Sequence, residues 1–131
     1  MAFHKIDLKQ WPLVFIDISP GSPTDEEFTA YLDDLIKLLG TGGKRAMVVD
    51  CTKSSNLSRQ HRRAQAAYLK DYSELIEEKI VGMAMIIQSP VIRTILSAII
   101  WIEPMSCPYK VFSTRKEGEA WCRELLALAK E

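Results

Sequence analysis

The segment AMVVDCTKSSNLSRQHRR, residues 46–63, is the most informative part of this chain about its fold. The apolar run from Ala46 to Val49 predicts a buried strand, which ends at Asp50. A loop rich in hydroxyl groups follows, and Ser58 then begins a helix that carries several cations. Because open α/β folds place their sites in the loops at the carboxyl ends of strands, we expect the functional residues here.

Strands and helices alternate on both sides of this stretch. Two adjacent runs at residues 3–8 and 13–18 predict an antiparallel hairpin. Thr24 and Glu27 form a capping box that begins a helix, and a glycine-rich run at 40–43 ends it. Periodicity then predicts a helix over 58–79, a strand over 80–87, a helix over 91–102, a strand over 109–112, and a final helix that begins at Thr114.

The element order is therefore β-β-α-β-α-β-α-β-α. This order predicts an α/β fold with a mixed, mostly parallel sheet of four to five strands and with four helices. A chain of 131 residues is large enough for one core and too small for two, so we expect a single domain over residues 1–131. In the final helix, the spacing of Trp121, Leu125 and Leu128 predicts that all three face inward.

Composition argues against several classes of protein. The formal net charge is zero, so nothing global favours nucleic acid or an anionic membrane surface as a partner. The first residues lack the apolar core of a signal peptide, and the longest apolar run, residues 95–102, is far shorter than the ~20 residues of a membrane span. Three cysteines without a CxxC pattern favour a reducing cytoplasm, and we expect neither a metal nor a cofactor.

Charges run against the helix dipole at both ends of the helix predicted over 58–79. A helix begins with a partial positive charge and ends with a partial negative one, so each misplaced side chain costs about 0.3–1 kcal/mol. The side chains near the beginning are cations: Lys53, Arg59, Arg62 and Arg63. Those near the end are acids: Glu74, Glu77 and Glu78. Either these cations, together with Asp50, bind an anion or an acidic partner, or they form a solvated face.

Three hydroxyl groups, those of Ser54, Ser55 and Ser58, lie in one predicted loop. One interpretation is that they supply turn hydrogen bonds and the N-cap of the helix. The other is that one of them, Ser58 first, accepts a phosphate, which the helix dipole and Arg62 would stabilise.

Asp50, Cys51 and His61 are residues of the types found in a Cys-His-Asp catalytic set. Nucleophilic catalysis requires a thiolate, a base within hydrogen-bond reach and an oxyanion hole. His61 falls on the apolar stripe of its helix, and no nucleophile elbow accompanies Cys51. We therefore interpret Cys51 and His61 as packing residues and do not expect an enzyme.

The predicted helix over 91–102 is apolar nearly all round. The positions that can face the sheet are Ile92, Ile95, Leu96 and Ile99. Ile100 and Trp101 remain outside this stripe, and an apolar face of this kind requires cover. Three explanations are open: the loop at 104–108 covers it, a second copy or a partner binds it, or it borders a groove for an apolar ligand whose anionic head group meets Arg93.

The element order resembles that of STAS domains, the SpoIIAA-like fold of bacterial anti-sigma-factor antagonists. In that family the strand before the second helix ends in an aspartate, and a partner kinase phosphorylates a Ser or Thr at the helix start. Asp50 and Ser58 occupy these positions, although the chain reads NLSR at 56–59 where the family signature is DSSG or DSTG. Two phrases, RRAQAAYL and SPVIRTILSAIIWIEPMSCP, are similar to a divergent STAS/SEC14-like branch.

The resemblance implies a non-catalytic regulatory module that interacts with another protein, a kinase or an anti-sigma-like partner, and that is phosphorylated at Ser58. For the SEC14-like branch it implies instead a carrier of a small apolar or amphipathic, lipid-like ligand. A homodimer is a further expectation from the apolar helix.

Overall fold

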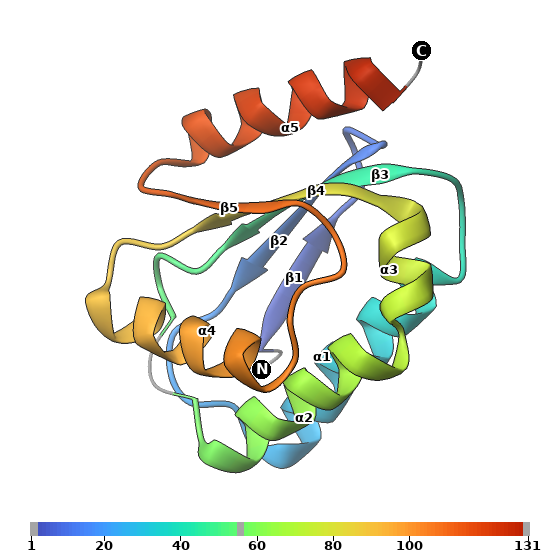
Figure 1. Ribbon diagram of the computed structural model, residues 1–131. Coiled ribbons are helices and arrows are strands. Elements are labelled where there is room, and N and C mark those ends of the chain that lie inside the picture. Colours follow the sequence, from blue (N-terminus) through green and yellow to red (C-terminus); the bar gives the residue numbers. More distant parts are fainter. Residues whose placement is uncertain (1–2, 55–56, 130–131) are drawn as a thin grey trace.

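Five strands form one mixed sheet in the computed structural model, which describes residues 3–54 and 57–129 (Figure 1). The strands are β1 (His4–Asp7), β2 (Leu13–Ile18), β3 (Arg45–Asp50), β4 (Ile80–Ile86) and β5 (Tyr109–Phe112). They lie side by side in the order β1-β2-β3-β4-β5. The β1–β2 pair is antiparallel and the other three pairs are parallel, which confirms the predicted hairpin and the mostly parallel sheet.

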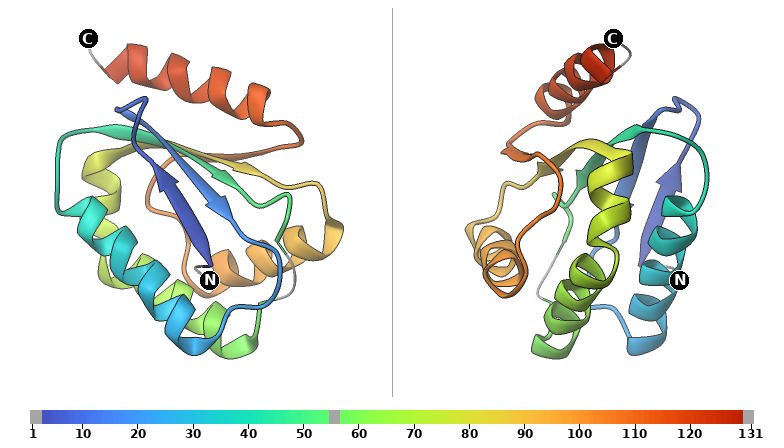
Figure 2. Two further views of the ribbon diagram at one scale, coloured as in Figure 1. Left: turned by 180° about the vertical axis from the view of Figure 1, so that it is seen from behind. Right: turned by 45° about the vertical axis from the view of Figure 1, so that its right-hand side comes forward.

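Helices cover the two faces of the sheet unequally. The helices are α1 (Asp25–Leu39), α2 (Arg59–Asp71), α3 (Ser73–Lys79), α4 (Pro90–Ile102) and α5 (Arg115–Ala129). Figures 1 and 2 show α5 alone on one side of the sheet and the other four helices on the opposite side. Because the crossovers β2-α1-β3, β3-α2-α3-β4 and β4-α4-β5 all pass over one face, the larger core forms there.

Local sequence signals account for where the helices begin. The Thr24 hydroxyl accepts a hydrogen bond from the Glu27 amide at 3.1 Å, and the Glu27 carboxylate accepts one from the Thr24 amide at 2.8 Å. The predicted capping box is therefore present at α1. Ser58 and Ser89 cap α2 and α4 in the simpler way, with each hydroxyl accepting from the amide three residues on.

The prediction of a single helix over 58–79 is wrong, because the helix is interrupted at Tyr72 and forms two helices, α2 and α3. Tyr72 has φ −111° and ψ 18°, outside the helical region. The break lets α2 pack against α4 while α3 turns back onto β4, where Ile76 is buried. The number of helices is therefore five in the described chain.

The break also corrects the predicted charge pattern at the far end of this segment. Glu74 lies in the first turn of α3, where an acid is favourable, and Lys70 lies in the last turn of α2, where a cation is favourable. The beginning of α2 keeps the unfavourable pattern, since its first turn contains no acid, and Glu77 and Glu78 still lie in the last turn of α3, next to Lys79.

Two hydrophobic cores lie on the two faces of the sheet. The smaller core, under α5, consists of Leu13, Phe15, Ala46, Val48, Ala84, Ile86 and Cys122. The larger core fills the other face and includes the apolar stripes of α1, α2 and α4. Leu128 was predicted to face inward, but it is 64% exposed, because the buried residues of α5, Gly118 and Cys122, lie in its first half.

Candidate functional site

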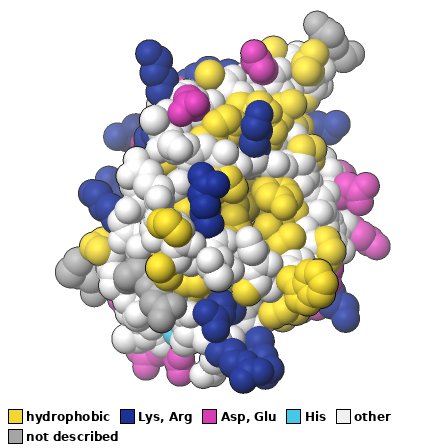
Figure 3. Space-filling model, turned by 60° about the vertical axis from the view of Figure 1, so that its left-hand side comes forward, with side chains coloured by type: hydrophobic (Ala, Val, Ile, Leu, Met, Phe, Trp, Pro, Cys, Tyr) yellow, Lys and Arg dark blue, Asp and Glu magenta, His cyan; other side chains and the backbone are white. Residues whose placement is uncertain are grey.

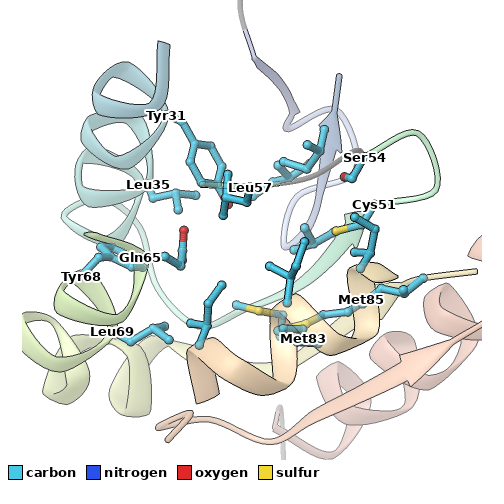
Figure 4. A pocket seen from close by; sticks show the side chains of 18 of the residues that line it. Tyr31, Leu35, Cys51, Ser54, Leu57, Gln65, Tyr68, Leu69, Met83 and Met85 are labelled. Atoms are coloured by element: carbon cyan, nitrogen blue, oxygen red, sulfur yellow. The ribbon is translucent and has the colours of Figure 1, made fainter. Parts of the chain in front are cut away.

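The larger core is not completely filled: it contains a cavity of about 160 Å³ between the sheet and the helices α1, α2 and α4 (Figure 4). Most of its lining is aliphatic or aromatic. The strands supply Ile16, Ile18, Met47, Val49, Met83 and Met85, and the helix α4 supplies Ile92, Ile95, Leu96 and Ile99. The four positions of α4 predicted to face the sheet therefore line this cavity.

Each wall of the cavity follows from a local pattern in the sequence. The stripe of α1 contributes Phe28, Tyr31 and Leu35, which recur at helical spacing. The strands β3 and β4 are apolar on both faces, as expected for parallel strands covered by helices on both sides. The helix α2 contributes Gln65, Tyr68 and Leu69, so a carboxamide and a hydroxyl enter a mostly apolar lining.

The beginning of α2 carries the predicted phosphate acceptor and most of the predicted cations. The Ser58 hydroxyl is exposed and accepts a hydrogen bond from the His61 amide at 3.1 Å, so Ser58 is the N-cap. Arg59 and Arg63 are exposed and Arg62 is half-buried. Ser54 is half-buried and lines the cavity, whereas Ser55 lies outside the described residues.

Asp50 does not join these arginines but pairs with Arg115 at the beginning of α5. Arg115 Nη1 lies 3.2 Å from Asp50 Oδ2 and 2.7 Å from Asp17 Oδ1, so one guanidinium ties the ends of β2 and β3 to α5. Burial opposes ionisation of Asp50, but hydrogen bonds from Thr52 and Arg115 outweigh it and hold the pKa of Asp50 below its ordinary value. Asp50 is therefore a structural anchor in this fold.

Lys53 lies with Asp50 rather than at α2. It lines a second hollow, of about 150 Å³, together with Asp17, Ile18, Asp50, Thr52 and Arg115. The cations that the sequence grouped as one candidate site are thus divided between two places. Because Asp50 and Asp17 already occupy the guanidinium of Arg115, this hollow offers little uncompensated charge to a ligand.

The outer face of α4 is apolar and largely uncovered. Trp101 is 89% exposed and Ile102 is 55% exposed, so the loop at 104–108 does not cover them, while Ile100 is half-buried. Figure 3 shows hydrophobic side chains intermingled with Lys and Arg on the side of the molecule where α4 and β5 lie, with acidic side chains toward its edges. Arg93 is exposed and does not line the cavity, so the expected cation at a cavity mouth is not there.

The structure confirms that His61 and Cys51 are packing residues. His61 is buried, its ring stacks on Phe28 with centroids 4.6 Å apart, and its Nε2 lies 2.8 Å from Asp25 Oδ1. Burial raises the pKa of the Cys51 thiol to about 11, so the sulfur is protonated at neutral pH and is a poor nucleophile.

Three residues in or around the site were not predicted from the sequence: Gln65, Arg115 and Arg45. Arg45 is completely buried at the beginning of β3, next to the end of α1. One signal was available, since an arginine that directly precedes a buried apolar strand and follows a glycine-rich run needs acceptors, and loop carbonyls supply them. No comparable sequence pattern indicates which residues Arg115 pairs with, or that Gln65 borders a cavity.

Two further properties concern the described part of the chain. No helix in it is long and apolar enough to cross a membrane. Within residues 3–54 and 57–129, no three or more His, Cys, Asp or Glu side chains gather in an arrangement that could hold a metal ion.

Comparison with known proteins identifies the fold. No protein-family model and no curated protein matches the chain. Among solved structures, it is similar to an uncharacterized protein of the DUF3478 family with a SpoIIAA-like fold from Shewanella loihica PV-4, at 16% identity and a TM-score of 0.65 over 91% of each chain. It is also similar to an anti-sigma factor antagonist from Mycobacterium paratuberculosis, at 15% identity and a TM-score of 0.62 over 92% of each chain. The chain therefore has the SpoIIAA-like fold that the resemblance to STAS domains predicted.

Proposed function

We propose that this protein is a non-catalytic regulatory module that binds a small apolar ligand in the cavity between the sheet and α1, α2 and α4. The cavity is the observation that carries the proposal. Protein interiors are normally close-packed, and an apolar cavity of about 150 Å³ is large enough to bind benzene. A ligand that fills a space of about 160 Å³ would bury apolar side chains of the sheet and of α4, which is favourable by roughly 25 cal/mol per Å² of apolar surface removed from water.

The helix α4 links the cavity to the surface. Its inner side chains, such as Ile95 and Ile99, line the cavity, and its outer side chain Trp101 is exposed. A ligand that packs against the inner face therefore acts on the element that presents the outer face. We propose that the outer face binds a protein partner, as the similarity to an anti-sigma factor antagonist supports.

The chemistry of the cavity supports binding rather than catalysis. Burial raises the pKa of the Cys51 thiol, and none of the described side chains that line the cavity is a carboxylate, an imidazole or an amine. The other proton-exchanging groups of the lining are the Tyr31 and Tyr68 hydroxyls and the Cys51 thiol, and burial raises their pKa values, so they stay protonated and supply no general base at neutral pH. The three free cysteines support a reducing compartment such as the cytoplasm.

Filling the cavity is expected to abolish ligand binding. Val49 lines the cavity from β3, so Val49→Phe places a ring in the space that the ligand would occupy. With ethylbenzene as the probe, isothermal titration calorimetry should show binding to the wild-type protein and at least about tenfold weaker binding to the variant. The free energy of unfolding should not fall, because the new ring removes empty volume.

Val91→Phe is the matched control for this variant. It makes the same change on α4, but Val91 is 60% exposed and does not line the cavity, so ethylbenzene binding should remain. Equal binding to the wild-type protein and Val49→Phe would contradict the proposal. So would a wild-type protein that binds no ethylbenzene and carries no small molecule in native mass spectrometry.

Phosphorylation at Ser58 is a second candidate function, and the structure of the α2 start favours it. The Ser58 hydroxyl is exposed at a helix N-terminus, and no acid lies in the first turn of α2. A phosphate there carries a charge of about −1.5 to −2, which would interact favourably with the helix dipole and with Arg59 and Arg62. The proposed role is a switch for partner binding.

Co-expression with a Ser/Thr kinase that modifies anti-sigma factor antagonists tests this switch by intact-mass analysis. We expect one phosphate in the wild-type protein and none in Ser58→Ala. Ser89→Ala is the matched control, because Ser89 is also a helix N-cap whose hydroxyl accepts a hydrogen bond from an amide three residues on. A phosphate that persists in Ser58→Ala, or that disappears in Ser89→Ala, would place the modification elsewhere.

A further inference from the structure

Three polar groups line the apolar cavity without a hydrogen-bond partner in the described chain: the hydroxyls of Tyr31 and Tyr68 and the carboxamide of Gln65. Tyr31 is 8% exposed and Tyr68 is 9% exposed, so neither hydroxyl has an ordinary surface position. Their polar atoms are not sealed off, because the fully buried side-chain atoms without a partner in the described chain are His4 Nδ1 and His61 Nδ1, and Gln65 is half-buried. These atoms are therefore accessible to a polar atom of a molecule that enters the cavity.

Figure 4 shows Tyr31 and Gln65 extending into the cavity from the helices α1 and α2. Gln65 can both donate and accept a hydrogen bond. Burial raises the pKa of Tyr31, so its hydroxyl stays protonated and can donate. Ser54 and Cys51 lie in the same lining, but the Ser54 hydroxyl and the Cys51 thiol are already hydrogen-bonded to each other. Tyr31, Tyr68 and Gln65 thus keep free hydrogen-bonding capacity, and Tyr31 and Gln65 are the two that extend into the cavity in Figure 4.

Charge is missing from the same lining. None of its described residues is Lys, Arg, His, Asp or Glu, and Arg93 of α4 is exposed and does not line the cavity. A carboxylate or phosphate placed inside would be a buried, unpaired charge, which is far more costly than a buried neutral group with a hydrogen bond. The cavity therefore discriminates against anions such as fatty acids.

From these contacts we infer that the ligand is a neutral molecule, about the size of a substituted benzene ring, with one alcohol or carbonyl oxygen that Gln65 and Tyr31 bind. This inference rests on the proposed ligand-binding function and adds the chemical class of the ligand. An alcohol fits best, because its oxygen accepts from Tyr31 while its proton is donated to the carboxamide oxygen of Gln65.

Three probes of nearly equal size test the chemical class of the ligand. They are benzyl alcohol, ethylbenzene and benzoate, each titrated into the full chain in a calorimeter. In a wholly apolar cavity the hydroxyl would make benzyl alcohol at least about tenfold weaker than ethylbenzene. Here we expect benzyl alcohol to bind at least as tightly as ethylbenzene, and benzoate not to bind. If benzyl alcohol binds tenfold more weakly than ethylbenzene, or if benzoate binds most tightly, the inference is overturned while the proposed function stands.

Two conservative variants test whether Gln65 and Tyr31 bind the oxygen of the ligand. Gln65→Leu and Tyr31→Phe remove polar atoms and keep the apolar bulk, so each should weaken benzyl alcohol binding about three- to tenfold and leave ethylbenzene binding unchanged. Thermal unfolding of both variants shows whether they are folded. Parallel loss of both probes would mean a merely structural role and would overturn the inference. Failure of all three probes to bind the wild-type protein would overturn the proposed function as well.

Discussion

Arg45→Met is expected to lower the free energy of unfolding by about 3 kcal/mol. Arg45 is 0% exposed, and its guanidinium donates to the backbone carbonyls of Leu38, Thr41 and Gly43. It also lies over the Trp11 ring, with its Cζ 4.8 Å from the ring centroid. Methionine keeps much of the apolar contact and removes every donor, so the carbonyls lose charge-assisted hydrogen bonds of about 1.5–3 kcal/mol each.

The position of these carbonyls explains why the loss is large. Leu38 lies in the last turn of α1, where the helix dipole places a partial negative charge. Thr41 and Gly43 belong to the turn that leads into β3. Arg45 therefore holds the end of α1, which forms one wall of the cavity, against the beginning of β3. Part of the effect is offset because Leu38 O also accepts from Thr41, so we expect about 3 kcal/mol rather than the sum of all bonds.

Urea denaturation measures this effect as a shift of the midpoint at constant slope. Arg45→Lys keeps the charge but cannot reach three carbonyls with a planar fork, so it should restore only part of the stability. Lys44→Met is the matched control, since Lys44 is exposed and its replacement should change the free energy of unfolding by less than about 0.5 kcal/mol. A stability of Arg45→Met equal to that of Lys44→Met would contradict the role given to these hydrogen bonds.

Gly118→Leu is expected to destabilise the protein by about 3 kcal/mol through overpacking beneath α5. A Cβ at Gly118 would lie 2.6 Å from Ile86 Cδ1 and 3.1 Å from Ala84 Cβ, so even one added carbon is crowded. The leucine fits only if α5 moves away from the sheet. That movement would expose the smaller core, including Phe15 and Val48, to water.

Ala120→Leu is the control on the same helix, because Ala120 is exposed and accepts the same side chain without a clash. Its free energy of unfolding, measured by urea denaturation, should match that of the wild-type protein within about 0.5 kcal/mol. The cavity lies on the other face of the sheet, so Gly118→Leu should still bind ethylbenzene in the absence of urea. Unchanged stability of Gly118→Leu would show that α5 does not pack as closely as the structure indicates.

A structural element was predicted correctly where the residues that define it are close together in the chain. The capping box of Thr24 and Glu27 formed as predicted, because its partners are three residues apart and need nothing from the rest of the chain. The break at Tyr72 was missed, because apolar residues continue at helical spacing through it. Only the different packing partners of α2 and α3 explain the break, and periodicity contains no information about them.

In the candidate site, too, local contacts could be predicted from the sequence and long-range contacts could not. Ser58 was correctly identified as an N-cap from the sequence. Asp50 was grouped with the cations of α2 because it is close to them in the chain, yet its partner is Arg115, 65 residues away. Lys53 was grouped with the same cations because it is close to them in the chain, yet it lines the second hollow together with Asp50. Proximity in sequence was therefore a poor guide to which charges meet.

Local patterns in the sequence suffice to predict the alternation of strands and helices, the mostly parallel sheet and the faces of α1 and α4 that turn inward. These follow from hydrophobic periodicity and capping, which act between residues a few positions apart. Contacts between distant segments account for the rest: the break at Tyr72, the Asp50–Arg115 pair, and the cavity of about 160 Å³ with Tyr31 and Gln65 in its wall. A cavity is the volume left when side chains from six or more elements meet, and no short segment of the chain specifies that volume.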